Sequence, residues 1–254
     1  MKVLVTFAVQ TEFARWRKRI AFRQRELVGI TVYQAQVGHA DVDVVVTGVG
    51  ASNARRAMQA VMNSSYSLCI SSGFAGGLKP GYAVGDLLAA QTLRATAEHG
   101  VLRCDDEWIA AAKRAGARGI DTLLSAEAIA RTAEQKSALA GIADAVDLES
   151  YAIVGAAQRC NVPAVVVRAV SDAFDQDMPM DFSGMISADG SVRMGGILRE
   201  MAAHPSVLLG LIRLGRQSNR AAERMADFFG AYLQNIGASA SSYPSRPLQV
   251  AAAL

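Results

Sequence analysis

The sequence predicts a single-domain α/β fold, a three-layer sandwich with helices around a central mixed, mostly parallel β-sheet. Short apolar runs typical of strands recur along the chain, with segments of helical composition between several of them. Several of the runs are continuously apolar rather than alternating, as expected of strands that are covered on both faces. The chain of 254 residues, 51% of them hydrophobic, can also build one sizeable core.

The individual elements follow in order along the chain. Runs rich in valine, leucine and isoleucine indicate strands, which we expect at residues 3–8, 42–47, 68–71, 86–91, 122–125 and 165–170. Other stretches have helical composition, and we expect helices at residues 52–62, 106–115, 126–139 and 150–160.

The C-terminal part differs from the rest. Residues 205–236 carry an amphipathic pattern, with apolar positions at Leu208, Leu209, Leu211, Ile212, Phe228, Phe229, Tyr232 and Leu233. One interpretation is a pair of helices packed on the core or on a subunit partner. The other is an apolar, arginine-flanked surface that receives a lipid-like substrate or makes peripheral contact with a membrane. Residues 237–254 resemble a flexible tail, so we expect the domain to span residues 1–236.

Composition excludes several classes of protein. The formal net charge is only +3, and the basic residues are scattered apart from residues 15–19 and the C-terminal arginines, so a nucleic-acid partner is not expected. The cysteines are odd in number and far apart, which argues against disulfides and zinc and favours a reducing compartment: Cys69, Cys104 and Cys160. The chain shows no signal-peptide pattern and no run of 18 apolar residues, so we expect a cytoplasmic protein. The histidines lack metal-ligand spacing, and we expect no metal and no cofactor: His39, His99 and His204.

Two glycine-rich turns follow two successive predicted strands. The first, Gly48-Val49-Gly50, lacks the later glycine of a dinucleotide fingerprint, because that position is Asn53. It also lacks the acidic residue expected about 20 positions further on. The second turn covers residues 71–78. Glycines allow the backbone to approach a ligand closely, and ligands of open α/β sheets bind beyond the carboxyl ends of strands.

Four carboxylates lie at comparable places, close to predicted strand ends: Glu12, Asp147, Glu149 and Asp172. Any one of them alone is explained by the preference of acids for helix N-termini. Together they suit the cleavage of a ribose–purine bond. One acid would hydrogen-bond or protonate a purine ring nitrogen, a second would activate water, and a third would bind the ribose hydroxyls as the sugar becomes cationic.

At these residues the chain resembles the nucleoside phosphorylase and nucleosidase superfamily, and most closely its methylthioadenosine/S-adenosylhomocysteine nucleosidase branch. The matching landmarks occur in order from residue 1 to about residue 181. They are Glu12, 47–50 (TGVG), 72–78 (SGFAGGL), 84–86 (VGD), 146–149 (VDLE) and 162–172 (VPAVVVRAVSD). The last block, at its spacing from residues 147–149, is the most specific of them.

The resemblance assigns roles to the acids and their neighbours and a binding function to the remaining site residues. It makes Glu12 the acid that activates water, Glu149 the residue that holds the ribose hydroxyls, and Asp172 the acid that engages the purine. Ser171 and Arg168 would support Asp172. The rest of the expected substrate-binding set is Gly50, Phe74, Ala75, Gly76, Asp147 and Leu148, with Leu148 where the family usually has methionine.

Two departures from the family argue against its usual small thioether substrates. Phe74 stands where the nucleosidases usually have a serine. The family's Gly-Asp-Ala-Phe segment corresponds to residues 126–129 (AEAI), so an aromatic residue that stacks on the purine is missing.

A narrower resemblance, carried by residues 5–8 (VTFA), 12–13 (EF) and 15–18 (RWRK), is to the hopanoid-associated branch. That branch is implicated in removing adenine from adenosylhopane in hopanoid biosynthesis. The apolar C-terminal region would suit such a bulky 5′ group.

Three functions therefore remain open. The first is a hydrolase that releases adenine from a 5′-substituted adenosine. The second is a purine nucleoside phosphorylase that holds phosphate with glycine-loop amides and with Arg55 or Arg56. The third is a non-catalytic module that binds a nucleoside or a lipid. Relatives in this superfamily are usually oligomers, so the resemblance implies a homo-oligomer.

Overall fold

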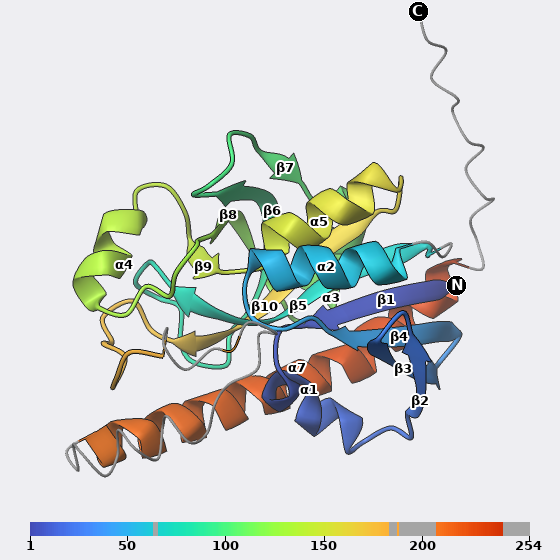
Figure 1. The fold of residues 1–254 in the computed structure, drawn as a ribbon, viewed down its shortest axis with the longest axis horizontal. Helices are drawn as coiled ribbons and strands as arrows, with labels where there is room; N and C mark the ends of the chain where they lie inside the picture. The colour runs from blue at the N-terminus through green and yellow to red at the C-terminus, as the bar shows by residue number, and fades with distance from the viewer. Residues whose placement is uncertain (63–65, 183–186, 188–206, 241–254) are drawn as a thin grey trace, which may run out of the picture.

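The computed structural model describes residues 1–62, 66–182, 187 and 207–240 (Figure 1). Its strands are β1 (Lys2–Phe7), β2 (Arg23–Leu27), β3 (Ile30–Val37), β4 (Ala40–Val46), β5 (Leu68–Gly77), β6 (Leu87–Ala95), β7 (Leu102–Arg103), β8 (Arg118–Ser125), β9 (Ala145–Asp147) and β10 (Ala164–Asp172). Its helices are α1 (Gln10–Arg17), α2 (Ala51–Val61), α3 (Asp106–Arg114), α4 (Ala133–Leu139), α5 (Ser150–Arg159) and α7 (Val207–Ala240).

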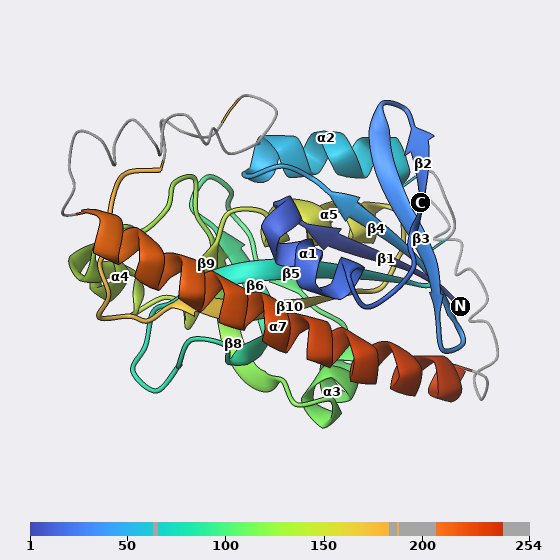
Figure 2. The same cartoon turned by 90° about the horizontal axis from the view of Figure 1, so that it is seen from below.

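The described strands form one mixed, ten-stranded sheet in the order β10-β6-β8-β9-β5-β1-β4-β3-β2, with β7 beside β6. Because β10 pairs with β5 as well as with β6, the strands β10, β6, β8, β9 and β5 close into a ring. Helices α2 and α5 pack together on one side of the sheet, and α1 and α7 pack together on the other (Figures 1 and 2). The expected α/β sandwich with a mixed sheet is therefore confirmed.

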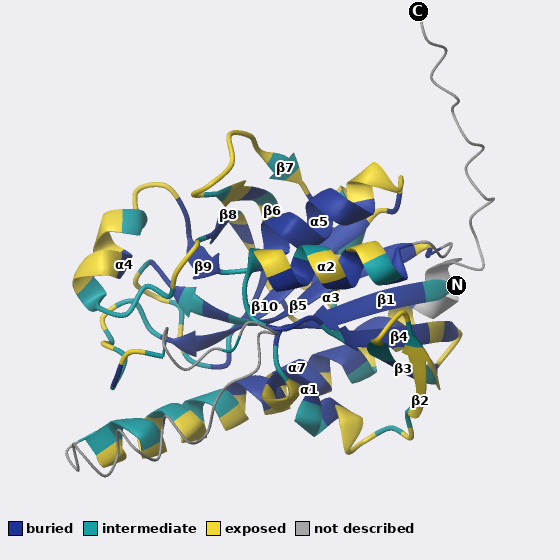
Figure 3. Ribbon diagram, viewed as in Figure 1, coloured by how far each residue is buried: buried dark blue, intermediate teal, exposed yellow. Residues whose placement is uncertain are grey.

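The core lies around β1, β5 and β10. The central strands are coloured as buried in Figure 3. Every residue of β10 is buried, and its valines at positions 165, 166, 167 and 170 are fully inaccessible. Burying a valine side chain stabilises the fold by roughly 1.5–3 kcal/mol, which explains why these runs are continuously apolar. Both β1 and β10 pair with β5 in parallel, so the three strands end at the same edge of the sheet.

Strand β5 is longer than expected. Residues 71–77 were expected to form a glycine-rich turn, but they continue the strand to Gly77. Strand β10 pairs with this segment up to Gly76, and β9 pairs with Gly76 and Gly77. The pairing with β10 along the segment, and with β9 at its end, supplies backbone hydrogen bonds that outweigh the low strand preference of glycine. Gly73 adopts a φ of +131°, a conformation that L side chains rarely adopt.

Two helix predictions were wrong in extent. The helix expected at residues 126–139 begins only at Ala133, because Thr132 caps it: the Thr132 hydroxyl accepts a hydrogen bond from the Gln135 amide. Residues 126–132 form bends and irregular backbone instead. The helix pair expected within residues 205–236 is one continuous helix, α7, whose C-terminal half packs along α1 and the sheet.

Some elements were not anticipated, namely α1, β2, β3, β7 and β9. The β2–β3 hairpin lies at the edge of the sheet, and residues 23–26 of β2 are all exposed and polar. The expected tail overlaps α7 at residues 237–240, and residues 241–254 lie outside the described part of the chain. Among the described helices, none combines the length and the apolarity needed to cross a membrane.

Candidate active site

A cavity of about 180 Å³ lies where several strands end. Residues near the ends of β1, β5, β9 and β10 form most of its wall, and Val49 after β4 and residues 128–130 after β8 add to it. The lining residues are Ala8, Val9, Glu12, Val49, Phe74, Ala75, Gly76, Ala128, Ile129, Ala130, Val146, Asp147, Leu148, Glu149, Ser171, Asp172 and Met178. The wall is mainly apolar, with a few carboxylates directed into it, as is usual for a small-molecule site.

Glu12 lies in the first turn of α1, and its side chain is buried. One carboxylate oxygen, Oε2, accepts hydrogen bonds from the amides of Ala8 (2.8 Å) and Val9 (3.1 Å). The other, Oε1, accepts one from the amide of Phe74 (2.8 Å), which ties the turn after β1 to β5. Burial raises the pKa of Glu12 above its ordinary value, although the charge of Arg168 and the three backbone hydrogen bonds oppose the shift.

Arg168 is buried at the centre of the site and binds the acid that ends β9, Asp147, and the acid that follows it, Glu149. Its Nη2 lies 2.6 Å from Asp147 Oδ2 and 3.5 Å from Glu149 Oε2. The same guanidinium donates to the hydroxyls of Ser71 (3.3 Å) and Ser150 (3.0 Å). A buried arginine needs such partners to balance its charge, so Arg168 anchors the carboxylates of β9 against β5 and β10.

Glu149 lines the cavity from the N-terminus of α5. Its Oε1 accepts a hydrogen bond from the amide of Gly50 at 2.9 Å, which joins the turn after β4 to the site. Burial raises the pKa of Glu149 to about 7; Arg168 opposes the shift, while the nearby charges of Asp147 and Glu12 add to it. The carboxyl group of Glu149 thus exchanges its proton close to neutral pH.

Asp172 closes β10, and both of its carboxylate oxygens have partners. Oδ1 accepts a hydrogen bond from the hydroxyl of Ser171 at 2.6 Å. Oδ2 lies 2.5 Å from the Nζ atom of Lys136, whose side chain is fully buried. Asp172 is therefore part of a buried ion pair at the cavity wall.

The structure brings the residues expected from the sequence to one place. Nine of them line the cavity: Glu12, Phe74, Ala75, Gly76, Asp147, Leu148, Glu149, Ser171 and Asp172. The other two lie directly behind the wall. Gly50 donates its amide to Glu149, and Arg168 holds Asp147 and Glu149 from the buried side, rather than supporting Asp172. The catalytic and binding roles of these residues remain predictions.

Other site residues were not anticipated. Val9, Val49 and Met178 add apolar wall, but such residues carry no distinctive pattern in the sequence. Lys136 was also missed, because a lysine within an alanine-rich helical segment has the composition of a solvated surface. Residues 126–129, which the resemblance aligns with the family's purine-stacking segment, place Ala128 and Ile129 in the cavity wall.

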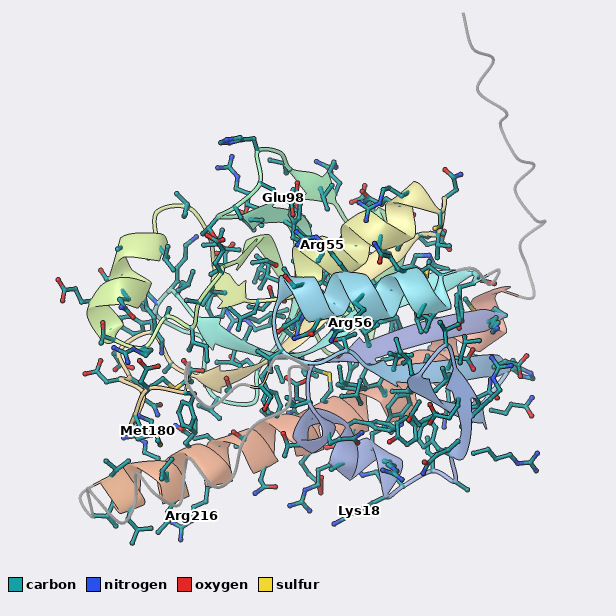
Figure 4. The ribbon with its side chains drawn as sticks, in the orientation of Figure 1. Lys18, Arg55, Arg56, Glu98, Met180 and Arg216 are labelled. Carbon is teal, nitrogen blue, oxygen red and sulfur yellow. The ribbon has the colours of Figure 1, made fainter. Side chains whose placement is uncertain are left out.

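The arginines considered for phosphate binding are engaged elsewhere. Arg55 pairs with Glu98, and Arg56 donates to the side chain of Asn53; neither arginine lines the cavity (Figure 4). Among the described residues, no cluster of histidine, cysteine, aspartate and glutamate has the arrangement of a metal site. His204 lies outside these residues.

A family model described as "Phosphorylase superfamily" matches residues 2–202 of the chain. Among solved structures, futalosine hydrolase from Helicobacter pylori aligns with a TM-score of 0.71 at 15% identity, over 92% of this chain and 99% of that one. The 5′-methylthioadenosine/S-adenosylhomocysteine nucleosidase of the same organism aligns with a TM-score of 0.71 at 16% identity, over 92% and 98%. The corresponding nucleosidase of Neisseria meningitidis, in complex with methylthio-immucillin-A, aligns with a TM-score of 0.70 at 19% identity, over 92% and 99%. At these identities the structural matches establish the common fold.

Proposed function

The chain belongs to the phosphorylase superfamily, and on that premise we propose that it is a nucleosidase that hydrolyses the N-glycosidic bond of a 5′-substituted adenosine and releases adenine. One observation carries the proposal: Glu12, Glu149 and Asp172, which are far apart in the sequence, all line the same cavity. The solved structures with the same fold include nucleosidases that act on this class of compound.

The reaction needs a base for the attacking water, and Glu12 suits that role. It is buried in the cavity wall, with a pKa raised towards the range in which a carboxylate accepts a proton readily. Water adds its hydroxyl group to the anomeric carbon of ribose while Glu12 takes the proton. The electron pair of the carbon–nitrogen bond passes to the purine, whose ring nitrogen gains a proton from solvent, and Glu12 then returns its proton to solvent. Overall, one water molecule is divided between ribose and base.

Two other carboxylates stabilise the separating halves. Glu149 accepts hydrogen bonds from the ribose hydroxyls, and its negative charge stabilises the cationic character that the sugar acquires. Asp172 accepts a hydrogen bond from the purine ring nitrogen once that nitrogen is protonated, so the base leaves as a neutral molecule rather than as an anion. Their positions on the wall support these roles, because β9 and β10 approach the cavity from different sides of β5.

The wall favours a substrate with an apolar 5′ group. Phe74, Ile129, Leu148 and Met178 line the cavity, and they offer few hydrogen-bonding groups. We propose adenosylhopane, an intermediate of hopanoid biosynthesis, as the substrate within this class. The resemblance of the N-terminal region to the hopanoid-associated branch supports it.

A lipid-like substrate would be taken up from a membrane, and the start of α7 suits such a contact. Pro179, next to the cavity residue Met178, lies against Gly210 of α7: a methyl group added to Gly210 would meet it at 2.6 Å. Leu208, Leu209 and Ile212, on the same turns of the helix, are exposed to solvent.

Basic residues continue this surface along α7. Arg213, Arg216 and Arg220 are exposed, and Arg216 points away from the body of the protein (Figure 4). An apolar tip followed by basic residues is the pattern of a helix that lies on an anionic membrane surface. Peripheral membrane contact is therefore part of the proposal.

The proposal also includes the cellular compartment and the oligomeric state of the protein. All three cysteines are free, which is consistent with a reducing compartment and supports a cytoplasmic protein. We also propose that the protein is a homo-oligomer, as the resemblance implies. Sedimentation at several protein concentrations tests this, and a sedimentation coefficient of a monomer at all of them contradicts it.

The decisive experiment measures adenine release from a panel of nucleosides, each with and without phosphate. The panel contains 5′-methylthioadenosine, S-adenosylhomocysteine, inosine and adenosylhopane. We expect release that does not depend on phosphate and that is fastest with the apolar 5′ group. Release that strictly requires phosphate would establish a phosphorylase instead, and no turnover of any nucleoside would favour a binding module.

The variant Asp172→Asn tests the assignment of Asp172. We expect it to slow adenine release by about 10²-fold or more, the usual contribution of an acid–base group. A rate equal to that of the wild type removes Asp172 from the mechanism.

A further inference from the structure

Lys136 is the buried residue of α4, a helix whose other residues are exposed or half-buried. Its Nζ atom lies 2.5 Å from Asp172 Oδ2, 2.7 Å from the carbonyl oxygen of Ala173 and 2.9 Å from that of Gln176. An ammonium group has three N–H donors, and these three acceptors use all of them. The group is therefore fully satisfied and directed at a residue of the cavity wall.

Packing alone does not account for a lysine at this place. Removing a charged group from water costs several kcal/mol unless a partner of opposite charge and further hydrogen bonds compensate it. An apolar side chain would fill the same space without that cost. The retained charge points to a task that an apolar side chain cannot perform.

Lys136 also fixes the segment that follows β10. Its bonds to Ala173 and Gln176 hold the start of this segment, and the amide of Ala133 donates to Asp177 Oδ1 at 2.7 Å. Met178, which lines the cavity, directly follows these residues. One lysine thus sets the position of Asp172 and of the wall beside it.

We propose that Lys136 is a positioning residue for cleavage of the glycosidic bond, which holds the carboxylate of Asp172 at the purine end of the cavity. This inference rests on the proposed function. The ammonium occupies one oxygen of Asp172 and the Ser171 hydroxyl occupies the other, so the carboxylate cannot rotate. Each oxygen retains a lone pair that can accept a hydrogen bond from a purine N–H group.

Lys136 is not a proton donor in this step. Its three protons are bound to Asp172 and to two backbone carbonyls, and they remain there while the bond breaks. The water molecule still supplies the hydroxyl group that ribose gains, and Glu12 returns the other proton of that water to solvent. Solvent protonates a ring nitrogen of the departing purine, and this N–H is the group that Asp172 binds. The positive charge of Lys136 stabilises the ionised Asp172, which is the form that accepts the purine N–H.

The test compares leaving groups in the variant Lys136→Met, which keeps the length of the side chain and removes its charge. One substrate is a 5′-substituted adenosine that the wild type cleaves, and the other is a 4-nitrophenyl riboside with the same 5′ group. Nitrophenolate leaves without help from Asp172. We expect kcat for the adenosine to fall by about 10²-fold, whereas kcat for the nitrophenyl riboside changes by less than about 5-fold.

Lys79→Met is the matched control. It breaks another lysine–aspartate pair, to Asp144, whose two residues do not line the cavity, and it should leave both rates near those of the wild type. Equal losses with both substrates in Lys136→Met would show that the lysine merely supports the fold. Unchanged rates with both would overturn the proposal as well.

Two further measurements separate this inference from the proposed function. In an Asp172→Asn background, Lys136→Met should cause almost no additional loss, because the lysine acts through Asp172. Calorimetric binding of adenine, which requires no turnover, should weaken at least 10-fold in Lys136→Met. If the wild type cleaves no nucleoside, the proposed function fails, and an unchanged adenine affinity then separately overturns the role of Lys136. If Lys136→Met does not fold, Lys136→Gln replaces it in every measurement.

Discussion

The substitution Gly73→Ala provides the most demanding test of the site geometry. A Cβ atom on Gly73 would lie 2.5 Å from the Nη1 atom of Arg168 and 2.8 Å and 2.9 Å from the two carboxylate oxygens of Glu12. These distances are too short for carbon against nitrogen or oxygen. The methyl group must therefore displace the proposed base and the buried arginine together.

The expected loss of stability has two parts. Placing alanine at a φ of +131° costs about 1–3 kcal/mol. Displacing a charged hydrogen-bonding group, here Glu12 or Arg168, costs roughly a further 1.5–3 kcal/mol. The sum, about 2.5–6 kcal/mol, is a large share of the roughly 5–15 kcal/mol by which domains are stable. A displacement of Glu12 by about 1 Å would also slow hydrolysis by about 10²-fold.

Gly116→Ala is the control, because Gly116 also has a positive φ, +102°, but a Cβ atom there would meet nothing within 4 Å. Gly116→Ala should therefore lose the stability that alanine at a positive φ costs, but it should keep the wild-type rate of adenine release. Urea denaturation gives the free energy of unfolding of each variant, and adenine release by the folded fraction gives its rate. If Gly73→Ala matches Gly116→Ala in both quantities, the assigned contact between Gly73, Glu12 and Arg168 is wrong.

Further predictions address the acids and the exposed end of α7. Glu12→Gln should slow hydrolysis by at least about 10²-fold, because an amide cannot take the proton of water. Substrate affinity, measured by calorimetry, should stay largely unchanged, and a collapse of binding would contradict the assignment of Glu12 as the base. Because burial raises the pKa of Glu149 to about 7 and also raises that of Glu12, kcat/KM should fall as the pH drops below about 7, and a flat profile from pH 5 to pH 8 would refute this. Between its ordinary pKa of 4.5 and about 7, the folded protein retains a proton on Glu149 that the unfolded chain has lost. The contribution of Glu149 to the free energy of unfolding is therefore fully present below pH 4.5 and decreases as the pH rises from 4.5 to about 7. In Glu149→Gln, the free energy of unfolding measured by urea denaturation should depend less on pH over this range. Leu209→Ser should reduce the fraction of protein that sediments with anionic vesicles several-fold. Val28→Ser is the control and should not reduce it, because Val28 is 75% exposed and Leu209 77%. Equal effects of the two substitutions would argue against membrane contact by α7.

The central strands were predictable because burial on both faces leaves a simple pattern. Residues 164–172 are continuously buried, and the valine-rich sequence indicates as much. The extension of β5 through Gly73 was not predictable, since pairing with strands distant in sequence overrides the local preference of glycine. The β2–β3 hairpin was missed for the opposite reason: it lies at the sheet edge, where polar residues are tolerated and no apolar pattern is needed.

The site was predictable where a residue follows a strand. Glu12 follows β1 and Asp172 ends β10, and both strands run parallel to β5, so their ends meet. The contact between Lys136 and Asp172 joins a short helix to a strand end, and this juxtaposition exists only after the chain has folded. The partners of Arg168 depend on the same tertiary arrangement. The family resemblance implies that Arg168 supports Asp172, whereas the guanidinium holds Asp147 and Glu149.

The closed ring of strands has a consequence for how the cavity wall is assembled during synthesis of the chain. During synthesis the ribosome releases β10 long after β1 and β5, so an emerging polypeptide can bury part of its core while one wall of the catalytic chamber does not yet exist. Ring closure is a long-range event, and such events are slow in protein folding. A nascent or shortened chain that lacks β10 also lacks Arg168, Ser171 and Asp172, so we expect adenine release only from a chain that has been synthesised through β10.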